Sequence, residues 1–256
     1  MTTSPKMPCE TVIVIPCFNE EQRLAPEAFT GFMKQHRDVA FLFVDDGSRD
    51  GTANVLERIC SEEPELASLV TLERNRGKAE AVRLGLLQAC RLGARFVGFW
   101  DADLSTPLGE IPRFLPYLRE SDYLMVLGSR VKLLGKDIRR RAMRHYVGRV
   151  FATCASLVLN IPVYDTQCGA KIFRVAPHLL DVLATPFLSK WIFDVEIIAR
   201  FQGLLCADKP RDIQYRLYEI PVERWVDVAG SKVRPRDFIE ALIELLRIHI
   251  KYGRRR

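Results

Sequence analysis

The chain has 256 residues and a formal net charge of +6, because 38 Lys and Arg residues outnumber 32 Asp and Glu residues. This length suffices for one domain with a well-developed core, and no linker, repeat or low-complexity tract interrupts the pattern. No apolar run reaches the roughly eighteen residues of a membrane span, and residues 1–10 lack the apolar centre of a signal peptide. We therefore expect a cytoplasmic protein without a transmembrane segment.

Cysteine and histidine usage excludes two common kinds of site. The cysteines form no Cys-x-x-Cys pair, which indicates reduced thiols rather than a disulfide framework. Cys17 and Cys168 fall in predicted site loops, but no histidine stands beside either in the sequence to activate a thiolate. The histidines are scattered without ligand spacing, which argues against a zinc site.

Apolar runs of strand length alternate with helix signals along the N-terminal part of the chain. The predicted strands are 11–16, 39–44, 68–72 and 95–100. We expect the first helix to start within 17–21 and the third to cover 79–92. This alternation predicts an α/β fold with a parallel sheet and right-handed crossovers, in which ligands bind beyond the carboxyl ends of the strands.

Two acids, Asp101 and Asp103, directly follow the fourth predicted strand. We expect their carboxylates to emerge on the same side of an extended chain, where like charges repel unless a cation lies between them. A hard divalent metal, Mg²⁺ or Mn²⁺, with oxygen ligands meets that need, and a solvated turn is the alternative. The sequence has no Gly-x-Gly-x-x-Gly or Walker motif, so any nucleotide must be bound by a different scheme.

Short polar motifs at the predicted strand ends occur in a recognisable order. They are 14–21, 44–48, 75–78, 101–107, 128–130, 165–171 and 191–196. On these motifs, which extend over about residues 10–235, the chain resembles inverting glycosyltransferases of family 2 with the GT-A fold. Within that family it most resembles the dolichyl-phosphate β-glucosyltransferases and, more distantly, the mannose synthases. The resemblance implies a GT-A domain over 1–235 and an amphipathic, basic C-terminal helix over 236–256.

The resemblance also implies a nucleotide-sugar donor, with UDP-glucose favoured, and Mg²⁺ or Mn²⁺ as cofactor. Asp46 would accept a hydrogen bond from the imide N–H of uracil. Asp101 would support the ribose and the surroundings of the metal, and Asp103 would bind the metal directly and be essential for catalysis. For Lys78, a place near the base or phosphates and a solvated place on the first helical turn remain open. The further nucleotide contacts that the resemblance implies are Pro16, Phe18, Glu20, Lys78, Ala102 and, from a lid, Ser231 and Lys232.

A basic segment follows the motif at 128–130 and predicts an acceptor with a phosphate group. Its candidate phosphate ligands are Arg130, Arg139, Arg140 and Arg144. A phosphate monoester is already ionised at neutral pH, whereas a sugar hydroxyl needs a general base. Asp165 is the first choice for positioning the acceptor or for acting as that base. We expect a polyprenyl phosphate acceptor; a hydroxyl-bearing lipid or glycan, or a GDP-mannose donor, is the alternative.

Two segments have the profile of membrane-surface helices. Residues 130–160 are first basic and then apolar, and residues 236–256 combine apolar residues at helical spacing with a basic end. Ordinary packing of these helices on the core is the alternative. We expect peripheral attachment to an anionic membrane surface on its cytoplasmic side.

Some charged residues leave two interpretations open, and two other protein classes are disfavoured. Asp194 and Glu196 fit either a cleft or the favourable first turn of a helix, and Lys171 fits either a phosphate contact or the surface. A sugar-nucleotide pyrophosphorylase would need a Gly-rich loop after the first strand, which is absent from the sequence. Nucleic-acid binding would rest on net charge alone, so we expect no nucleic-acid partner.

Overall fold

The computed structural model describes residues 9–139, 142–205, 213–228 and 235–253. Its N-terminal part alternates strands and helices: β1 (Thr11–Cys17), α1 (Pro26–Gln35), β2 (Val39–Asp45), α2 (Thr52–Glu62), β3 (Ala67–Thr71), α3 (Lys78–Arg91) and β4 (Phe96–Trp100). The remaining elements are η1 (Leu108–Glu110), α4 (Ile111–Arg119), β5 (Met125–Ser129), β6 (Asp137–Arg139), α5 (Ala142–Leu159), β7 (Ala170–Arg174), α6 (Pro177–Leu183), α7 (Phe193–Leu205), α8 (Ile213–Arg216), β8 (Leu217–Pro221), β9 (Arg224–Val226) and α9 (Pro235–Tyr252).

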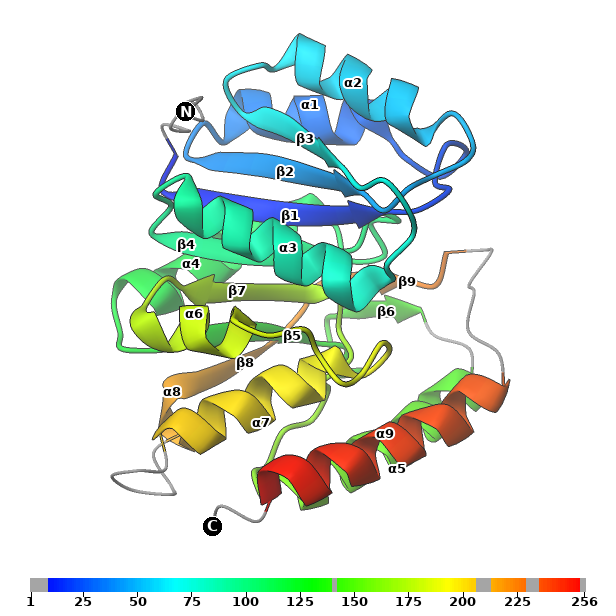
Figure 1. Cartoon of the computed structure of the whole chain (residues 1–256), viewed down its shortest axis with the longest axis vertical. Helices are drawn as coiled ribbons and strands as arrows, with labels where there is room; N and C mark the ends of the chain where they lie inside the picture. Colours follow the sequence, from blue (N-terminus) through cyan, green and yellow to red (C-terminus); the bar gives the residue numbers. More distant parts are fainter. Residues whose placement is uncertain (1–8, 140–141, 206–212, 229–234, 254–256) are drawn as a thin grey trace.

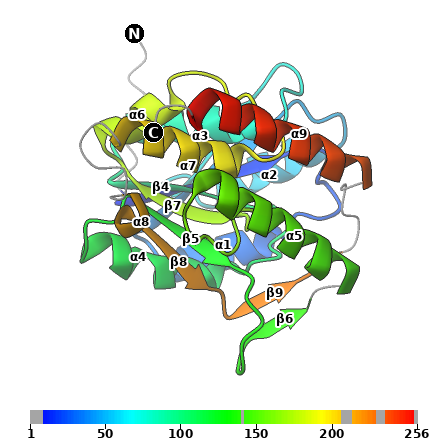
Figure 2. The same cartoon turned by 90° about the horizontal axis from the view of Figure 1, so that it is seen from below.

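The described strands form one large mixed sheet and one small sheet. The order in the large sheet is β3-β2-β1-β4-β7-β5-β8, and β6 pairs with β9 in the small one. Strands β1 to β4 are parallel to one another, whereas β7 runs antiparallel to both β4 and β5. Helices α3, α6 and α7 cover one face of the large sheet, and α1 and α4 cover the other (Figures 1 and 2). The predicted α/β fold with a mostly parallel sheet is confirmed.

Apolar strands and tight helix packing form the core. Strand β2 is buried along its whole length, and Phe29 of α1 packs edge-to-face on Phe41 and Phe43 with ring centroids 5.4 and 5.2 Å away. On the other face, a Cβ at Gly85 of α3 would lie 2.4 Å from Cγ1 of Val14. Glycine at this position therefore lets α3 lie close to β1, which fixes the height of α3 above the sheet.

The first helix begins later than the sequence pattern predicts. Arg23 and Leu24 donate their N–H groups to the carbonyl of Glu20 at 2.8 and 2.9 Å, which closes a turn. The helix α1 then starts at Pro26, a residue whose fixed φ suits the first helical position. The prediction of a helix start within 17–21 was wrong because local backbone hydrogen bonds make a turn there instead.

Helices α5 and α9 lie side by side at the opposite end of the molecule from α2, and α9 also contacts α7 (Figures 1 and 2). On α9 the side chains of Ala241, Leu245 and Ile248 are buried. A second apolar stripe, Ile243, Leu246 and Ile250, is exposed. Because apolar side chains lie on two sides of α9, the predicted amphipathic character of the C-terminal helix is not confirmed. The division of the chain at residue 235 stays a prediction. None of the helices in the described ranges is long and apolar enough to cross a bilayer.

Candidate active site

The antiparallel strand β7 determines which loops meet at the carboxyl edge of the sheet. Its first residue, Ala170, pairs with Trp100, the last residue of β4. The loop that precedes β7 therefore lies where β4 and β5 end. The N–H of Asp101 donates to the carbonyl of Gly169 at 3.0 Å, and a Cβ on Gly169 would lie 1.9 Å from Oδ2 of Asp101. A side chain at this position would force the Asp101 carboxylate to move from the place that it occupies here.

The Asp101-Ala102-Asp103 segment forms a turn rather than the extended chain that we expected. The N–H of Leu104 donates to the carbonyl of Asp101 at 3.1 Å, and Leu104 itself has φ of 51°. The Asp103 carboxylate accepts the N–H of Ser105 at 3.0 Å, which holds the turn from within. Ala102, between the two acids in the sequence, is buried.

Each of the two acids has a cation of its own. The Nζ of Lys78, at the start of α3, lies 2.5 Å from Oδ1 of Asp101. Nη2 of Arg23 lies 3.2 Å from Oδ2 of Asp103, and Nε of Arg23 lies 3.1 Å from Glu20. Burial lowers the pKa of Lys78, but the carboxylates around it, Asp101 first, raise that pKa by more, so the net shift is upward.

The acids can serve as part of a metal shell. Their carboxylate oxygens are hard ligands, and their side chains are partly exposed, 33 % for Asp101 and 24 % for Asp103. In the described ranges no three His, Cys, Asp or Glu side chains come together as a metal cluster. Mg²⁺ is commonly held by one or two carboxylates together with substrate phosphates and water. Asp101 and Asp103 therefore fit Mg²⁺ or Mn²⁺ as an incomplete set that a diphosphate would complete.

The residues predicted for the nucleotide lie along the same edge. Pro16, Phe18 and Glu20 are at or just beyond the end of β1. Asp46, just after β2, accepts the N–H groups of Arg76 at 2.7 Å and Gly77 at 2.8 Å.

The contacts of Asp46 shape the loop that leads to α3. Burial raises the pKa of Asp46, and the two backbone N–H groups partly offset that effect. The structure thus gives Asp46 a positioning task, and its contact with uracil stays a prediction.

Two residues predicted separately for the acceptor are partners in the structure. Arg130, directly after β5, donates from Nε and Nη2 to the two oxygens of Asp165, each at 2.7 Å, and from its backbone N–H at 3.0 Å. Its guanidinium also lies over the ring of Trp225, 5.5 Å from the centroid. The N–H of Gln167 adds a contact of 3.3 Å to Asp165. With both oxygens engaged, Asp165 is suited to positioning Arg130 rather than to accepting a proton.

The other predicted anion ligands either lie away from the Arg130–Asp165 pair or fall outside the described residues. Arg139 lies on β6, is exposed, and forms an ion pair of 2.8 Å with Asp137. Arg140, Ser231 and Lys232 lie outside the described residues, as does the side chain of Arg144. Their roles stay predictions.

Glu219 of β8 is a site residue that the sequence did not reveal. Its carboxylate accepts the N–H of Tyr164 at 2.8 Å and the N–H of Asp165 at 2.6 Å. Burial is the largest cause that raises the pKa of Glu219 to about 7, and the nearby Asp165 adds to it. Glu219 is 54 residues away in the sequence from Asp165, so its sequence neighbourhood gives no signal of this contact.

Lys171 and Asp194 form a buried pair behind the cleft. Their Nζ and Oδ1 atoms are 2.5 Å apart, and Lys171 has no exposed surface. Both interpretations of Lys171, a phosphate contact and a surface residue, were therefore wrong, because β7 is an internal strand. Burial raises the pKa of Asp194, while Lys171 and Lys78 oppose that shift. Asp194 thus lies close enough to Lys78 to belong to the charge network of the cleft.

Glu196, two residues after Asp194 on α7, has a structural role. It accepts the N–H of Ser189 at 3.0 Å, Nη2 of Arg200 at 2.7 Å and the hydroxyl of Tyr252 at 3.0 Å. These contacts join α7 to α9 and to the loop before α7. Of the two interpretations that the sequence left open, the structural one holds for Glu196.

The two cysteines near the cleft are protonated thiols. Burial raises the pKa of Cys168 to about 11, and burial also raises the pKa of Cys17 well above its usual value. The prediction that neither acts as a nucleophile agrees with these shifts.

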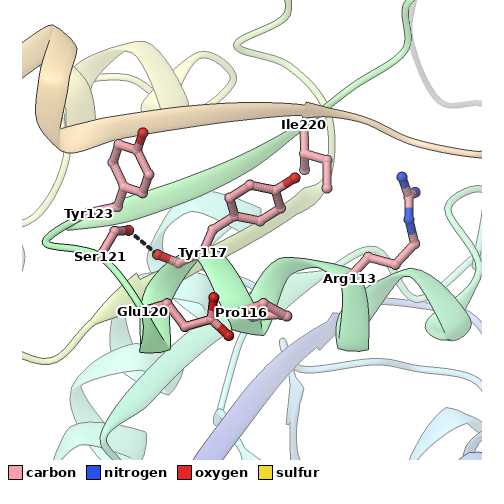
Figure 3. A pocket seen from close by; sticks show the side chains of 7 residues that line it. All are labelled: Arg113, Pro116, Tyr117, Glu120, Ser121, Tyr123 and Ile220. Carbon is pink, nitrogen blue, oxygen red and sulfur yellow. Dashed lines mark hydrogen bonds between the residues drawn. The ribbon is translucent and has the colours of Figure 1, made fainter.

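A separate hollow lies on the surface beside α4. It measures about 610 Å³ and is lined by Arg113, Pro116, Tyr117, Glu120, Ser121, Tyr123 and Ile220 (Figure 3). The hydroxyl of Ser121 donates to the carbonyl of Tyr117. None of the predicted site residues lines this hollow, so it is distinct from the cleft at the strand ends.

Comparison with known proteins identifies the family. The family model described as "Glycosyl transferase family 2" matches residues 12–179. The chain belongs to this family. The match extends from β1 to α6 and so includes the Asp101–Asp103 turn and the Arg130–Asp165 pair, and the sequence-based resemblance is confirmed.

Curated relatives and a solved structure agree with the family. This glycosyltransferase is 28 % identical over 256 residues to the dolichyl-phosphate beta-glucosyltransferase of Dictyostelium discoideum, covering 94 % of the chain and 74 % of the relative. It is 30 % identical over 260 residues to the human protein of the same name, covering 94 % and 75 %. The crystal structure of glucosyl-3-phosphoglycerate synthase from Mycobacterium tuberculosis with Mn²⁺, UDP-glucose and phosphoglyceric acid superposes with a TM-score of 0.61 at 20 % identity, covering 95 % of this chain and 81 % of that one. This likeness shows a shared GT-A fold.

The buried carboxyl of Glu219 predicts a pH-dependent stability. Its pKa is about 7 in the folded protein and near 4.5 in the unfolded chain, so the folded state holds the proton more tightly. The contribution of Glu219 to the free energy of unfolding therefore decreases as the pH rises between these values, by about 2 kcal/mol. We expect the free energy of unfolding of Glu219→Gln, measured in urea, to rise relative to that of the wild type as the pH increases over this range, because the amide has no proton to lose.

Glu62→Gln, at an exposed position on α2, is the matched control and should follow the wild type. A constant difference between Glu219→Gln and the wild type across the range would contradict this assignment.

Proposed function

We propose that this glycosyltransferase moves glucose from UDP-glucose to the phosphate of a polyprenyl lipid, with Mg²⁺ or Mn²⁺, at the cytoplasmic surface of a membrane. The relatives named dolichyl-phosphate beta-glucosyltransferase support the sugar and the acceptor. One observation carries the proposal. The Asp101–Gly169 contact brings the two candidate metal ligands, Asp101 and Asp103, next to the loop that holds the Arg130–Asp165 pair.

On the donor side, the charges suit a diphosphate. Asp101 and Asp103 would hold the metal, which when bound supplies positive charge to the diphosphate as it departs. Lys78 and Arg23 already stand beside these acids and add fixed positive charge. The loop that Asp46 holds, together with the end of β1, would form the nucleotide wall.

On the acceptor side, the geometry suits an anion better than an alcohol. An oxygen of the acceptor phosphate would attack the anomeric carbon on the face opposite the diphosphate. The new carbon–oxygen bond forms as the bond to the diphosphate breaks, and the electron pair leaves with UDP, so the configuration inverts. An ionised phosphate has no proton to lose in this step. Asp165, whose oxygens are engaged by Arg130, is therefore adequate as a positioning residue.

We expect a purified-protein assay to separate this reaction from the alternatives. UDP release should require UDP-glucose, divalent metal and a short polyprenyl phosphate, whereas GDP-mannose or the matching polyprenol should give no turnover. Asp103→Asn should lower kcat by about 100-fold or more, because it removes charge at the metal.

Asp122→Asn, an exposed acid in the loop before β5, is the control and should keep wild-type activity. Equal turnover with polyprenol would instead favour a hydroxyl acceptor, and full activity of Asp103→Asn would contradict the assigned metal ligand.

We also propose that α5 and α9 form the membrane-facing surface. Their exposed apolar side chains form one stripe on each helix, at helical spacing: Tyr146, Val150 and Leu157 on α5, and Ile243, Leu246 and Ile250 on α9. Exposed basic residues of α9, Arg247 and Lys251, stand among them. Apolar insertion combined with attraction to anionic headgroups is the usual basis of peripheral binding.

Sedimentation with lipid vesicles measures whether this surface binds membranes. The protein should bind vesicles that contain anionic phospholipid more than neutral ones, and Leu157→Glu or Leu246→Glu should reduce the bound fraction severalfold by placing charge in the apolar stripe. Leu180→Glu, at an exposed position on α6, should bind like the wild type. Binding that neither stripe variant changes would contradict the proposed face.

A further inference from the structure

Arg23 forms ion pairs with two acids on the donor side of the site, Asp103 and Glu20. Its Nη2 contacts Oδ2 of Asp103 at 3.2 Å, and its Nε contacts Oε2 of Glu20 at 3.1 Å. The side chains of Arg23 and Asp103 are each 24 % exposed, so both charges are partly removed from water. An Arg23 that leaves Asp103 can keep its contact with Glu20, three residues away on the same turn.

The protein already offsets most of the negative charge around the Asp101–Asp103 turn. Asp101, Asp103 and Glu20 carry three negative charges, and Lys78 and Arg23, in contact with them, carry two positive charges. A divalent cation added alone would turn this partly buried cluster from net negative to net positive, and burial makes such an excess charge costly. A divalent cation that arrives with a diphosphate brings negative charge with it, so no positive excess arises.

We propose that Arg23 competes with the divalent metal for the Asp103 carboxylate, so that metal binds well only together with the nucleotide diphosphate. This inference rests on the proposed donor site and adds an order of binding to it. Arg23 is then a positioning residue: it holds Asp103 in place beforehand and moves toward Glu20 when the metal takes the carboxylate. Uncomplexed metal is thereby kept from occupying the cleft without a donor.

Lys78 pairs with Asp101 as Arg23 pairs with Asp103, but a change at Lys78 would test the proposal less cleanly. Its charge is also influenced by Asp194 and Asp103, so its removal would disturb the buried pair behind the cleft. Arg23 lies on the loop between β1 and α1 and pairs with Asp103 directly. The experiment therefore changes Arg23.

Mn²⁺ binding to the full-length protein without nucleotide tests the proposal, with free Mn²⁺ measured from its electron paramagnetic resonance signal. Arg23→Gln should bind Mn²⁺ about two- to fivefold more tightly than the wild type, the range expected when one partly exposed ion-pair partner is removed. Arg23→Lys keeps the charge and should remain close to the wild type. Arg37→Gln is the control, because Arg37 pairs with Glu63 and Glu65 at the amino-terminal edge of the sheet.

The outcomes separate this inference from the proposed function. With saturating UDP, the wild type should bind Mn²⁺ far more tightly than without it, and the advantage of Arg23→Gln should disappear. Equal or weaker Mn²⁺ affinity of Arg23→Gln without nucleotide, in a variant whose melting curve shows it folded, overturns the competition. Equally tight binding by Arg23→Lys and Arg23→Gln overturns it too. Failure of the wild type to bind Mn²⁺ even with UDP would instead refute the donor site itself.

Discussion

The close approach of Gly169 to Asp101 is the constraint on which the cleft depends. The backbone of the loop before β7 lies against the carboxylate at the end of β4, with one hydrogen bond of 3.0 Å between the two chains. A side chain at Gly169 would require that carboxylate to move. Because β7 is antiparallel to β5, this loop also brings Asp165 to the end of β5, where Arg130 directly follows the strand. One contact thereby sets the spacing between the donor and acceptor sides.

Paired charge is the second general property of the site. The carboxylates of Asp101, Asp103, Asp165 and Asp194 each contact a basic side chain. Charges removed from water are tolerated when they are paired and hydrogen-bonded, and breaking such a pair is strongly destabilising. Asp165 and Asp194, whose ion pairs are largely buried, are therefore also part of the fold. A substrate that carries negative charge, such as a nucleotide diphosphate or a lipid phosphate, can exchange partners with these pairs without leaving a charge unpaired.

The sequence predicted those features that are encoded locally. Continuous apolar runs gave β1, β2 and β4, and the polar residues after them, such as Asp46 and Asp101, gave the edge where the site lies. Contacts between distant segments were not predictable in the same way. Arg23 and Asp103 are 80 residues apart, and Glu219 is 54 residues from the N–H of Asp165 that it binds.

The internal position of β7 explains the error at Lys171. A short apolar strand carries no mark of its place in the sheet, so Lys171 was predicted to meet phosphate or solvent although it is buried on a strand that lies between two others. The extended geometry expected for Asp101 and Asp103 failed for a local reason, since Asp103 accepts the N–H of Ser105 and bends the chain. The family motifs led to residues that lie along one edge of the sheet, but the pairing of their charges required the three-dimensional structure.

Calorimetric binding of UDP with Mn²⁺ to two glycine variants tests the central claim most directly. Gly169→Ala places a methyl group on the Asp101 carboxylate, whereas Gly109→Ala, in η1, meets no atom within 4 Å. The account predicts that Gly169→Ala, while still folded, binds UDP with Mn²⁺ at least about tenfold more weakly than the wild type. It predicts no change for Gly109→Ala. Wild-type affinity in Gly169→Ala would contradict the claim that this contact positions the donor acids.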